Sequence, residues 1–163
     1  TDAFLDLLGT VRSKAPAAGV RSNVIVGFPG ETEADVAELE RFLVEARLDV
    51  VGVFGYSDED GTEAEGLPDH LPQDVVDERV ARLQDLVEEL TSQRAEERVG
   101  ERVSVLVESA DGEGRAEHQA PEVDGSTTVV GARPGEVVEA EVVASEGVDL
   151  VAVPVHALAT ARA

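Results

Sequence analysis

The first 98 residues alternate between two hydrophobic patterns, one helical and one strand-like. Residues 2–15 carry apolar side chains at helical spacing, and the Ala15-Pro16 pair ends this predicted helix. Two later runs, 23–28 and 50–54, are apolar without alternation. Continuous apolar runs are typical of parallel strands that are covered on both faces. We therefore expect two neighbouring parallel strands in this half of the chain.

A helix is predicted between these strands, because Thr32 and Asp35 match the Ser/Thr-x-x-Asp/Glu pattern of a helix start. The apolar positions that follow recur at helical spacing: Val36, Leu39, Leu43 and Ala46. The resulting strand-helix-strand unit is expected to cross over right-handed. Beyond a Gly- and acid-rich loop at 57–71, a second apolar stripe predicts a long helix between Pro72 and Gly100.

Residues 99–160 are rich in Val and Gly and show no helical pattern. Turn signals such as Asp111-Gly112 and Pro134-Gly135 separate short alternating runs. Antiparallel strands this short favour a small closed barrel, since closure removes exposed strand edges. The five strands are expected at 102–108, 114–118, 127–130, 137–144 and 148–155.

These patterns predict an α/β domain over residues 1–94 and an all-β domain over residues 95–163. Apolar residues make up 42% of the chain, which supports a packed core. No apolar run approaches the ~20 residues of a membrane span, and no basic segment precedes an apolar one near the N-terminus. We therefore expect no membrane association and a cytoplasmic location.

The chain carries 35 acidic and 13 basic side chains, a formal net charge of -22. Binding of nucleic acid by phosphate neutralisation requires clustered Lys and Arg, whereas here the single lysine is Lys14 and the arginines are scattered. A nucleic-acid partner is therefore disfavoured and a cationic partner is favoured. The preference for Arg over Lys also fits a GC-rich genome, in which case part of the acidity reflects base composition.

The sharpest local motif is Gly27-Phe28-Pro29-Gly30-Glu31-Thr32. It stands at the end of a predicted parallel strand and runs into a capped helix, which is where α/β proteins bind ligands. The structural alternative is a tight turn in which Gly27 and Gly30 relieve backbone strain. The residues themselves leave both interpretations open.

No metal site is predicted. Asp58-Glu59-Asp60-Gly61 fails as a calcium loop, because Tyr56 and Leu67 would occupy the positions of its first and last acidic ligands. The histidines at 70, 118 and 156 have no second ligand at metal-binding spacing. Without cysteine, the chain has no thiolate nucleophile and no thiolate ligand for an iron–sulfur cluster.

Several segments resemble a known enzyme family. VIVGFPGET (24–32), EARLD (45–49), VGVFGYS (51–57) and the Gly61-Thr62 pair are similar to the later part of the radical SAM barrel in methylthiotransferases. The tail resembles the TRAM domain that closes those enzymes, and GRAEHQAPEVDG (114–125) resembles their ribosomal-protein branch, the RimO branch. The resemblance spans essentially the whole chain. It implies the distal part of a radical SAM (β/α) partial barrel followed by a five-stranded antiparallel, OB-like TRAM barrel.

The resemblance also implies an activity. In that branch a methylthio group is added to the β-carbon of an aspartate in the twelfth small-subunit ribosomal protein, and S-adenosylmethionine supplies both the radical and the methyl group. Two [4Fe-4S] clusters take part, and the cysteines that hold them are absent from this sequence. The resemblance therefore implies the C-terminal portion of a longer protein, inactive by itself.

By position, the resemblance places Ile25, Gly27, Gly30 and Glu31 in the barrel segment that approaches the adenosyl group, and Tyr56 near the adenine. The usual Gly-x-Ile-x-Gly-x-x-Glu spacing is not reproduced, since position 23 is Asn and three residues separate the glycine from the glutamate. No residue of this chain is assigned a catalytic role.

Recognition of the ribosomal protein is expected from Glu117, Glu122 and Asp124, for which solvation of a turn is the alternative. One rival function is methylthiolation of an adenosine in tRNA, which would require a basic TRAM face. Another is a non-catalytic adaptor with an OB-like binding barrel. The adaptor would need a self-contained first domain, whereas two parallel strands form too small a sheet to cover itself.

Overall fold

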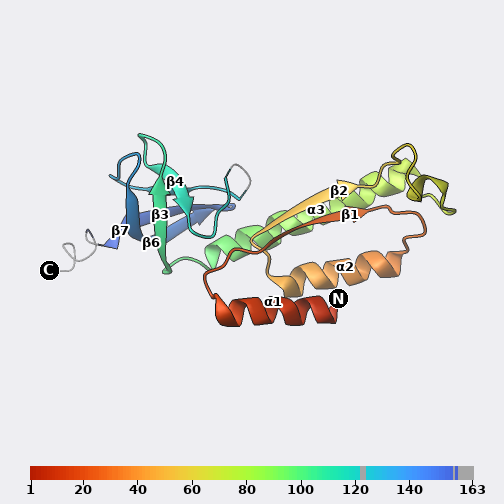
Figure 1. The fold of residues 1–163 in the computed structure, drawn as a ribbon, viewed down its shortest axis with the longest axis horizontal. Coiled ribbons are helices and arrows are strands. Elements are labelled where there is room, and N and C mark those ends of the chain that lie inside the picture. Colours follow the sequence, from red (N-terminus) through yellow and green to blue (C-terminus); the bar gives the residue numbers. More distant parts are fainter. Residues whose placement is uncertain (122–123, 156, 158–163) are drawn as a thin grey trace.

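The computed structural model describes residues 1–121, 124–155 and 157, and within them two parts follow one another along the chain (Figure 1). The first part is helical with a small sheet, and the second consists of strands. The elements of the first part are α1 (Asp2–Lys14), β1 (Arg21–Val26), α2 (Glu33–Ala46), β2 (Val50–Gly55), the 3-10 helix η1 (Ala64–Gly66) and α3 (Gln73–Glu96). Those of the second part are β3 (Arg102–Val107), β4 (Glu113–Ala116), β5 (Thr127–Val129), β6 (Val137–Glu146) and β7 (Asp149–Pro154).

Helix α2 begins where the sequence predicts. The Thr32 hydroxyl accepts a hydrogen bond from the Asp35 backbone N–H at 3.3 Å, and the Asp35 carboxylate accepts one from the Thr32 N–H at 2.9 Å. This reciprocal capping box satisfies two of the free N–H groups at the helix start. At the other end, Arg47 adopts a left-handed conformation with φ of 47° and leads the chain toward β2.

Strands β1 and β2 pair in parallel, with Ile25 opposite Phe54. The apolar side chains of α1, α2 and α3 gather on one face of this sheet, where Val26 is fully buried. On the other face Ile25 is 60% exposed and Phe54 is 54% exposed. The expectation that both faces are covered is therefore wrong for the described residues, because all three helices pack on the same side. We call this sheet the open sheet, and its uncovered side the open face.

The second part is a closed barrel with the strand order β3-β4-β5-β7-β6, and all five predicted strands form. The prediction of an entirely antiparallel barrel is wrong, because β5 and β7 pair in parallel. An odd number of strands cannot alternate in direction around a ring, so one neighbouring pair must run the same way. The barrel interior is filled mainly by Val103, Val105, Val107, Val129, Val142 and Leu150.

Helix α3 joins the two parts (Figure 1). Ala95, near its C-terminal end, packs in the core of the closed barrel. The barrel lies beside the amino ends of β1 and β2, whereas the segment 57–72 lies at the opposite end of the sheet (Figure 1). The division between residues 94 and 95 stays a prediction. No helix in the described part of the chain combines the length and the apolar character needed to cross a membrane.

Candidate functional site

The carboxyl edge of the open sheet is formed by the loops that follow β1 and β2. Gly27 has φ of 87°, and a Cβ there would lie 2.6 Å from a Val76 methyl group of α3. Gly30 has φ of 83°, and its N–H donates to the Asp69 carbonyl oxygen at 2.9 Å. Both glycines are therefore required by the backbone, and Gly30 ties this loop to the segment that follows β2.

Glu31 is held from two sides. One of its carboxylate oxygens accepts the Gly27 N–H at 3.0 Å and lies 2.6 Å from an Nη of Arg79. Arg79 is only 6% exposed and also pairs with Glu33 at 2.6 Å. The Glu31 side chain is 13% exposed, so its carboxylate fixes the loop to α3. Sequence patterns did not identify Arg79, because it lies 48 positions from Glu31.

An aromatic cluster borders the same edge. The rings of Phe28 and Tyr56 meet edge to face with centroids 5.2 Å apart, and the His70 ring lies 6.2 Å from that of Tyr56. The Tyr56 hydroxyl donates to the Asp58 carboxylate at 2.9 Å. Burial, and then this hydrogen bond, raise the pKa of Tyr56 above its usual value. The phenol therefore stays protonated at neutral pH and its ring presents an apolar surface.

The open face leads from this edge along the sheet. In the parallel register, Ile25 stands beside Phe54 and Asn23 stands beside Gly52. A Cβ at Gly52 would lie 2.5 Å from the Asn23 amide oxygen, so the glycine leaves room for that side chain. Asn23 and Phe54 were not among the predicted site residues, although strand parity places them on the same face as Ile25.

The residues at this edge suit one of the two cofactors implied by the family resemblance and not the other. An exposed apolar face beside aromatic rings matches the flat, apolar faces of an adenosyl group. A [4Fe-4S] cluster needs thiolates, and the chain contains no cysteine. No group of three or more potential metal ligands occurs within the described residues.

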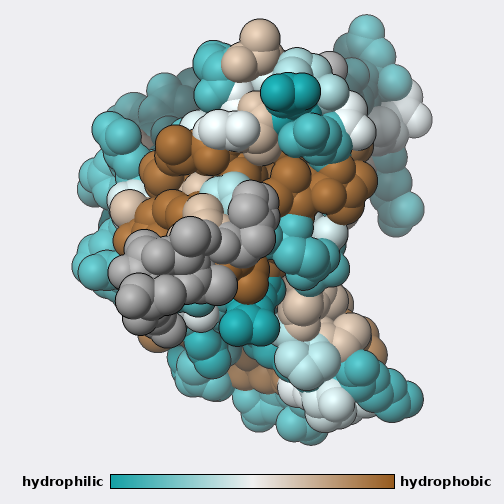
Figure 2. Space-filling view, turned by 90° about the vertical axis from the view of Figure 1, so that its left-hand side faces the viewer, coloured by the Kyte–Doolittle hydropathy of each residue, from teal (hydrophilic) through white to brown (hydrophobic). Residues whose placement is uncertain are grey.

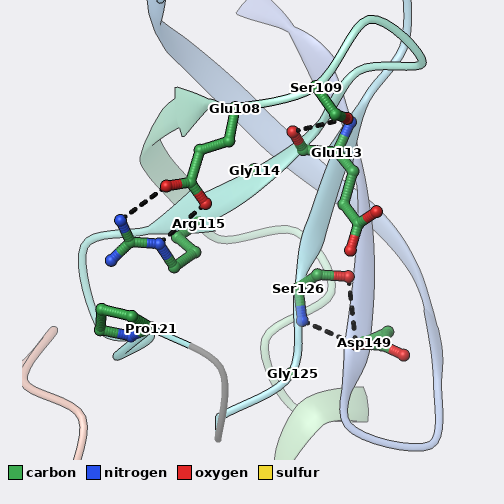
Figure 3. A pocket seen from close by; sticks show the side chains of 9 residues that line it. All are labelled: Glu108, Ser109, Glu113, Gly114, Arg115, Pro121, Gly125, Ser126 and Asp149. Atoms are coloured by element: carbon green, nitrogen blue, oxygen red, sulfur yellow. Dashed lines mark hydrogen bonds and ion pairs between the residues drawn. The ribbon is translucent and has the colours of Figure 1, made fainter. Parts of the chain in front are cut away.

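The closed barrel carries a pocket of about 560 Å³ on its surface (Figure 3). Three carboxylates line it, those of Glu108, Glu113 and Asp149. Arg115 lies in the same pocket and forms a two-pronged ion pair with Glu108, at 2.9 and 2.7 Å, which lowers the pKa of that carboxyl. The remaining carboxylates give the pocket a net negative charge.

Of the three residues predicted to recognise a substrate, the structure describes Glu117 and Asp124. Glu117 is exposed after β4, and Glu122 lies outside the described residues. Asp124 is only 9% exposed, and its carboxylate accepts hydrogen bonds from Arg21 at 3.1 Å and from the Ala120 N–H at 2.8 Å. It therefore connects the barrel to the start of β1. The role of these residues in recognition stays a prediction.

The barrel end of the molecule also exposes apolar side chains. Figure 2 shows hydrophobic residues gathered in the middle of this face and bordered by hydrophilic ones. Among the large apolar side chains of the barrel, Val137 is 67% exposed and Val130 is 61% exposed. The barrel surface is thus acidic without being polar throughout.

Comparisons with known proteins agree with this architecture. Residues 99–155 match the TRAM domain family. The chain is 66% identical over 161 residues to the ribosomal protein uS12 methylthiotransferase RimO of Streptomyces avermitilis, an alignment that covers 94% of this chain and 32% of that protein. Proteins of the same name from Streptomyces coelicolor and Salinispora tropica are 65% and 61% identical, each over 94% of this chain and 33% of their own length.

A closed barrel that matches the TRAM domain family follows an open parallel sheet, and the relatives that match both parts carry the name of methylthiotransferases. Over 94% of its length the chain is similar to members of the RimO family. It spans about a third of the length of the curated relatives it matches.

Proposed function

We propose that this chain is the C-terminal part of a radical SAM methylthiotransferase that modifies an aspartate of ribosomal protein uS12 at its β-carbon. The observation that carries the proposal is the identity of 66% to a protein of that name across 94% of the chain. The open sheet supports it, because an uncovered face and unpaired strand edges are expected of a sheet that continues in further strands.

In the proposed enzyme the open face borders the cofactor. S-adenosylmethionine, when bound, supplies the methyl group and the radical. The Ile25 and Phe54 side chains offer apolar surface to the adenosyl group, and Tyr56 with Phe28 limits the access of water at the carboxyl edge. Glu31 orients the loop through its contacts with Gly27 and Arg79. The cluster ligands belong to the part of the protein outside this chain.

A protein substrate is favoured over tRNA by charge. Twelve acidic residues against four basic ones follow residue 99, and three carboxylates line the barrel pocket. Such a surface repels phosphates and attracts Lys- and Arg-rich partners, with an attraction that weakens as salt shortens the Debye length from ~8 Å. We accordingly propose a basic ribosomal protein as partner and the cytoplasm as location.

The test uses the complete enzyme, reconstituted with iron and sulfide and supplied with either uS12 or tRNA. Methylthiolation of an aspartate in uS12, detected by mass spectrometry of its peptides, is the expected result. Modification of tRNA alone would show that the charge argument is misleading. In the same experiment this chain alone should bind no iron, because it lacks thiolates.

A further inference from the structure

Charged and titratable side chains meet where the closed barrel lies against the amino edge of the open sheet. They surround a cavity of only about 20 Å³, which leaves room for roughly one water molecule. We call this cluster the interdomain junction; it consists of Asp49, Arg94, Arg98, His118 and Asp124.

Asp49 stands at the centre of the junction, directly before β2, with a side chain that is 12% exposed. One carboxylate oxygen accepts the Val20 N–H, just before β1, at 2.8 Å. The other accepts a hydrogen bond from Arg98 Nη2 at 2.5 Å and lies 3.3 Å from Arg94 Nε. A single carboxylate therefore joins the starts of both strands to the segment that enters the barrel.

The partners of Asp49 are themselves buried or doubly engaged. Arg98 is 2% exposed and also pairs with Glu101 at 3.0 Å, directly before β3. From the barrel side, Asp124 pairs with Arg21 at the first position of β1. The Gly19 backbone approaches the His118 carbonyl oxygen so closely that a Cβ at Gly19 would collide with it. Contacts on both sides of Asp49 thus hold one orientation of the barrel.

The junction lies far from the carboxyl edge. Helix α3, which runs from that edge to the barrel, has 24 residues and is therefore ~36 Å long. A partner held by the barrel must reach the cofactor across this distance, so a small rotation at the junction becomes a large displacement at the edge. We propose that Asp49 is a positioning residue: through Arg98 and Arg94 it sets the orientation of the TRAM barrel and thereby the place of the bound protein substrate. The effect of Asp49 on substrate position rests on the proposed function, whereas its effect on the orientation of the barrel rests on geometry alone.

The structural consequence is tested on this chain, whose lack of cysteine allows spin labels at chosen sites. Labels are introduced by Ala37→Cys on α2 and Glu139→Cys on β6, both exposed positions. Asp49→Asn keeps the shape but leaves the buried Arg98 with Glu101 as its one remaining ion-pair partner, so the single narrow distance between the labels should broaden. Asp85→Asn, the same change at an exposed site on α3, should leave it narrow. If Asp49→Asn prevents folding, Arg21→Gln, which removes only the contact with Asp124, should broaden the distance to a smaller extent.

The catalytic consequence is tested on the complete enzyme with two substrates, the whole ribosomal protein and a short peptide around its target aspartate. Asp49→Asn should raise KM for the whole protein about tenfold and leave kcat for the peptide unchanged, since a peptide does not need the barrel. An unchanged label distance, or equal losses on both substrates, would overturn the proposal. If the unmutated enzyme modifies neither substrate, the proposed function fails, and the label distances still decide whether Asp49 orients the barrel.

Discussion

The open sheet and the closed barrel use the same kind of residue in different ways. Both are built from short Val-rich strands, but each barrel strand has two neighbours, whereas β1 and β2 have only each other among the described residues. The barrel interior holds Val105 and Val129 with no exposure, while the sheet leaves Ile25 and Phe54 largely in water. Closure gives every barrel strand two neighbours, whereas the sheet keeps one face uncovered within the described residues.

The comparison predicts that the two parts differ in how they respond to loss of core volume. Leu83 on α3 and Leu150 on β7 are matched probes, since they are 0% and 1% exposed. Replacement by Ala should cost about 2–5 kcal/mol at either site. Leu83→Ala should remove amide protection from the sheet and its helices and leave β3–β7 protected, because the barrel keeps its own core. Leu150→Ala should remove amide protection from the barrel strands.

Hydrogen exchange followed by mass spectrometry measures both variants at the level of peptides. Loss of protection in both parts of the chain after Leu83→Ala would contradict the comparison, because it would make sheet and barrel one cooperative unit. The junction around Asp49 would then couple their folding as well as their orientation.

The sequence predicted what depends on neighbouring residues and missed what depends on distant ones. Thr32 and Asp35 identified the start of α2, and alternation with turn residues located all five barrel strands. The parallel β5–β7 pair was missed because strand direction follows from closure, which no local pattern reports.

The candidate site shows the same limit. From the sequence alone, a Glu31 that faces a ligand cannot be distinguished from a Glu31 that pairs with the buried Arg79. In the sequence Asp124 looks like an ordinary solvated turn residue, because its partner Arg21 lies 103 positions away. Patterns therefore pointed to the edge at which we propose that a ligand binds, and only the structure shows which of its charges are already paired.

The interdomain junction should make the free energy of unfolding depend on pH through His118. Burial, followed by the charge of Arg98, lowers the pKa of His118 from 6.5 to about 4. Between pH 6.5 and about 4, His118 is therefore protonated in the unfolded chain and neutral in the folded chain. Stability from this group is complete above pH 6.5 and is lost as the pH falls toward 4, by about 1–2 kcal/mol once solvent access is allowed for.

Urea unfolding at a series of pH values measures this effect. His118→Gln should flatten the dependence between pH 6.5 and 4, whereas His70→Gln, at the opposite end of the molecule, should keep it. An identical pH dependence in the parent chain and in His118→Gln would show that His118 is accessible to protons in the folded state.

The smallest effect is expected on the open face. Phe54 and Val53 are neighbours on β2 that point to opposite sides of the sheet, with exposures of 54% and 9%. Threonine suits a strand at either position, so replacement isolates the effect of burial. Phe54→Thr should change the free energy of unfolding of this chain by only about 0.5 kcal/mol, because more than half of the residue is already exposed. Val53→Thr should cost about 1–3 kcal/mol, because it places a hydroxyl in the core beneath the helices.

Thermal unfolding of both variants, in this chain and in the complete protein, tests whether the open face gains neighbours in the complete protein. If the sheet continues beyond β1 and β2 in the complete protein, Phe54 faces other residues or the cofactor there. Phe54→Thr should then lower the free energy of unfolding more in the complete protein than in this chain. A cost that stays near zero in the complete protein would mean that the face is open in the enzyme as well. In that case the exposed apolar surface of Ile25 and Phe54 would bind a ligand that comes and goes, and would contribute nothing to the stability of the open sheet while the ligand is absent. Only a group that is bound in the folded state stabilises that state.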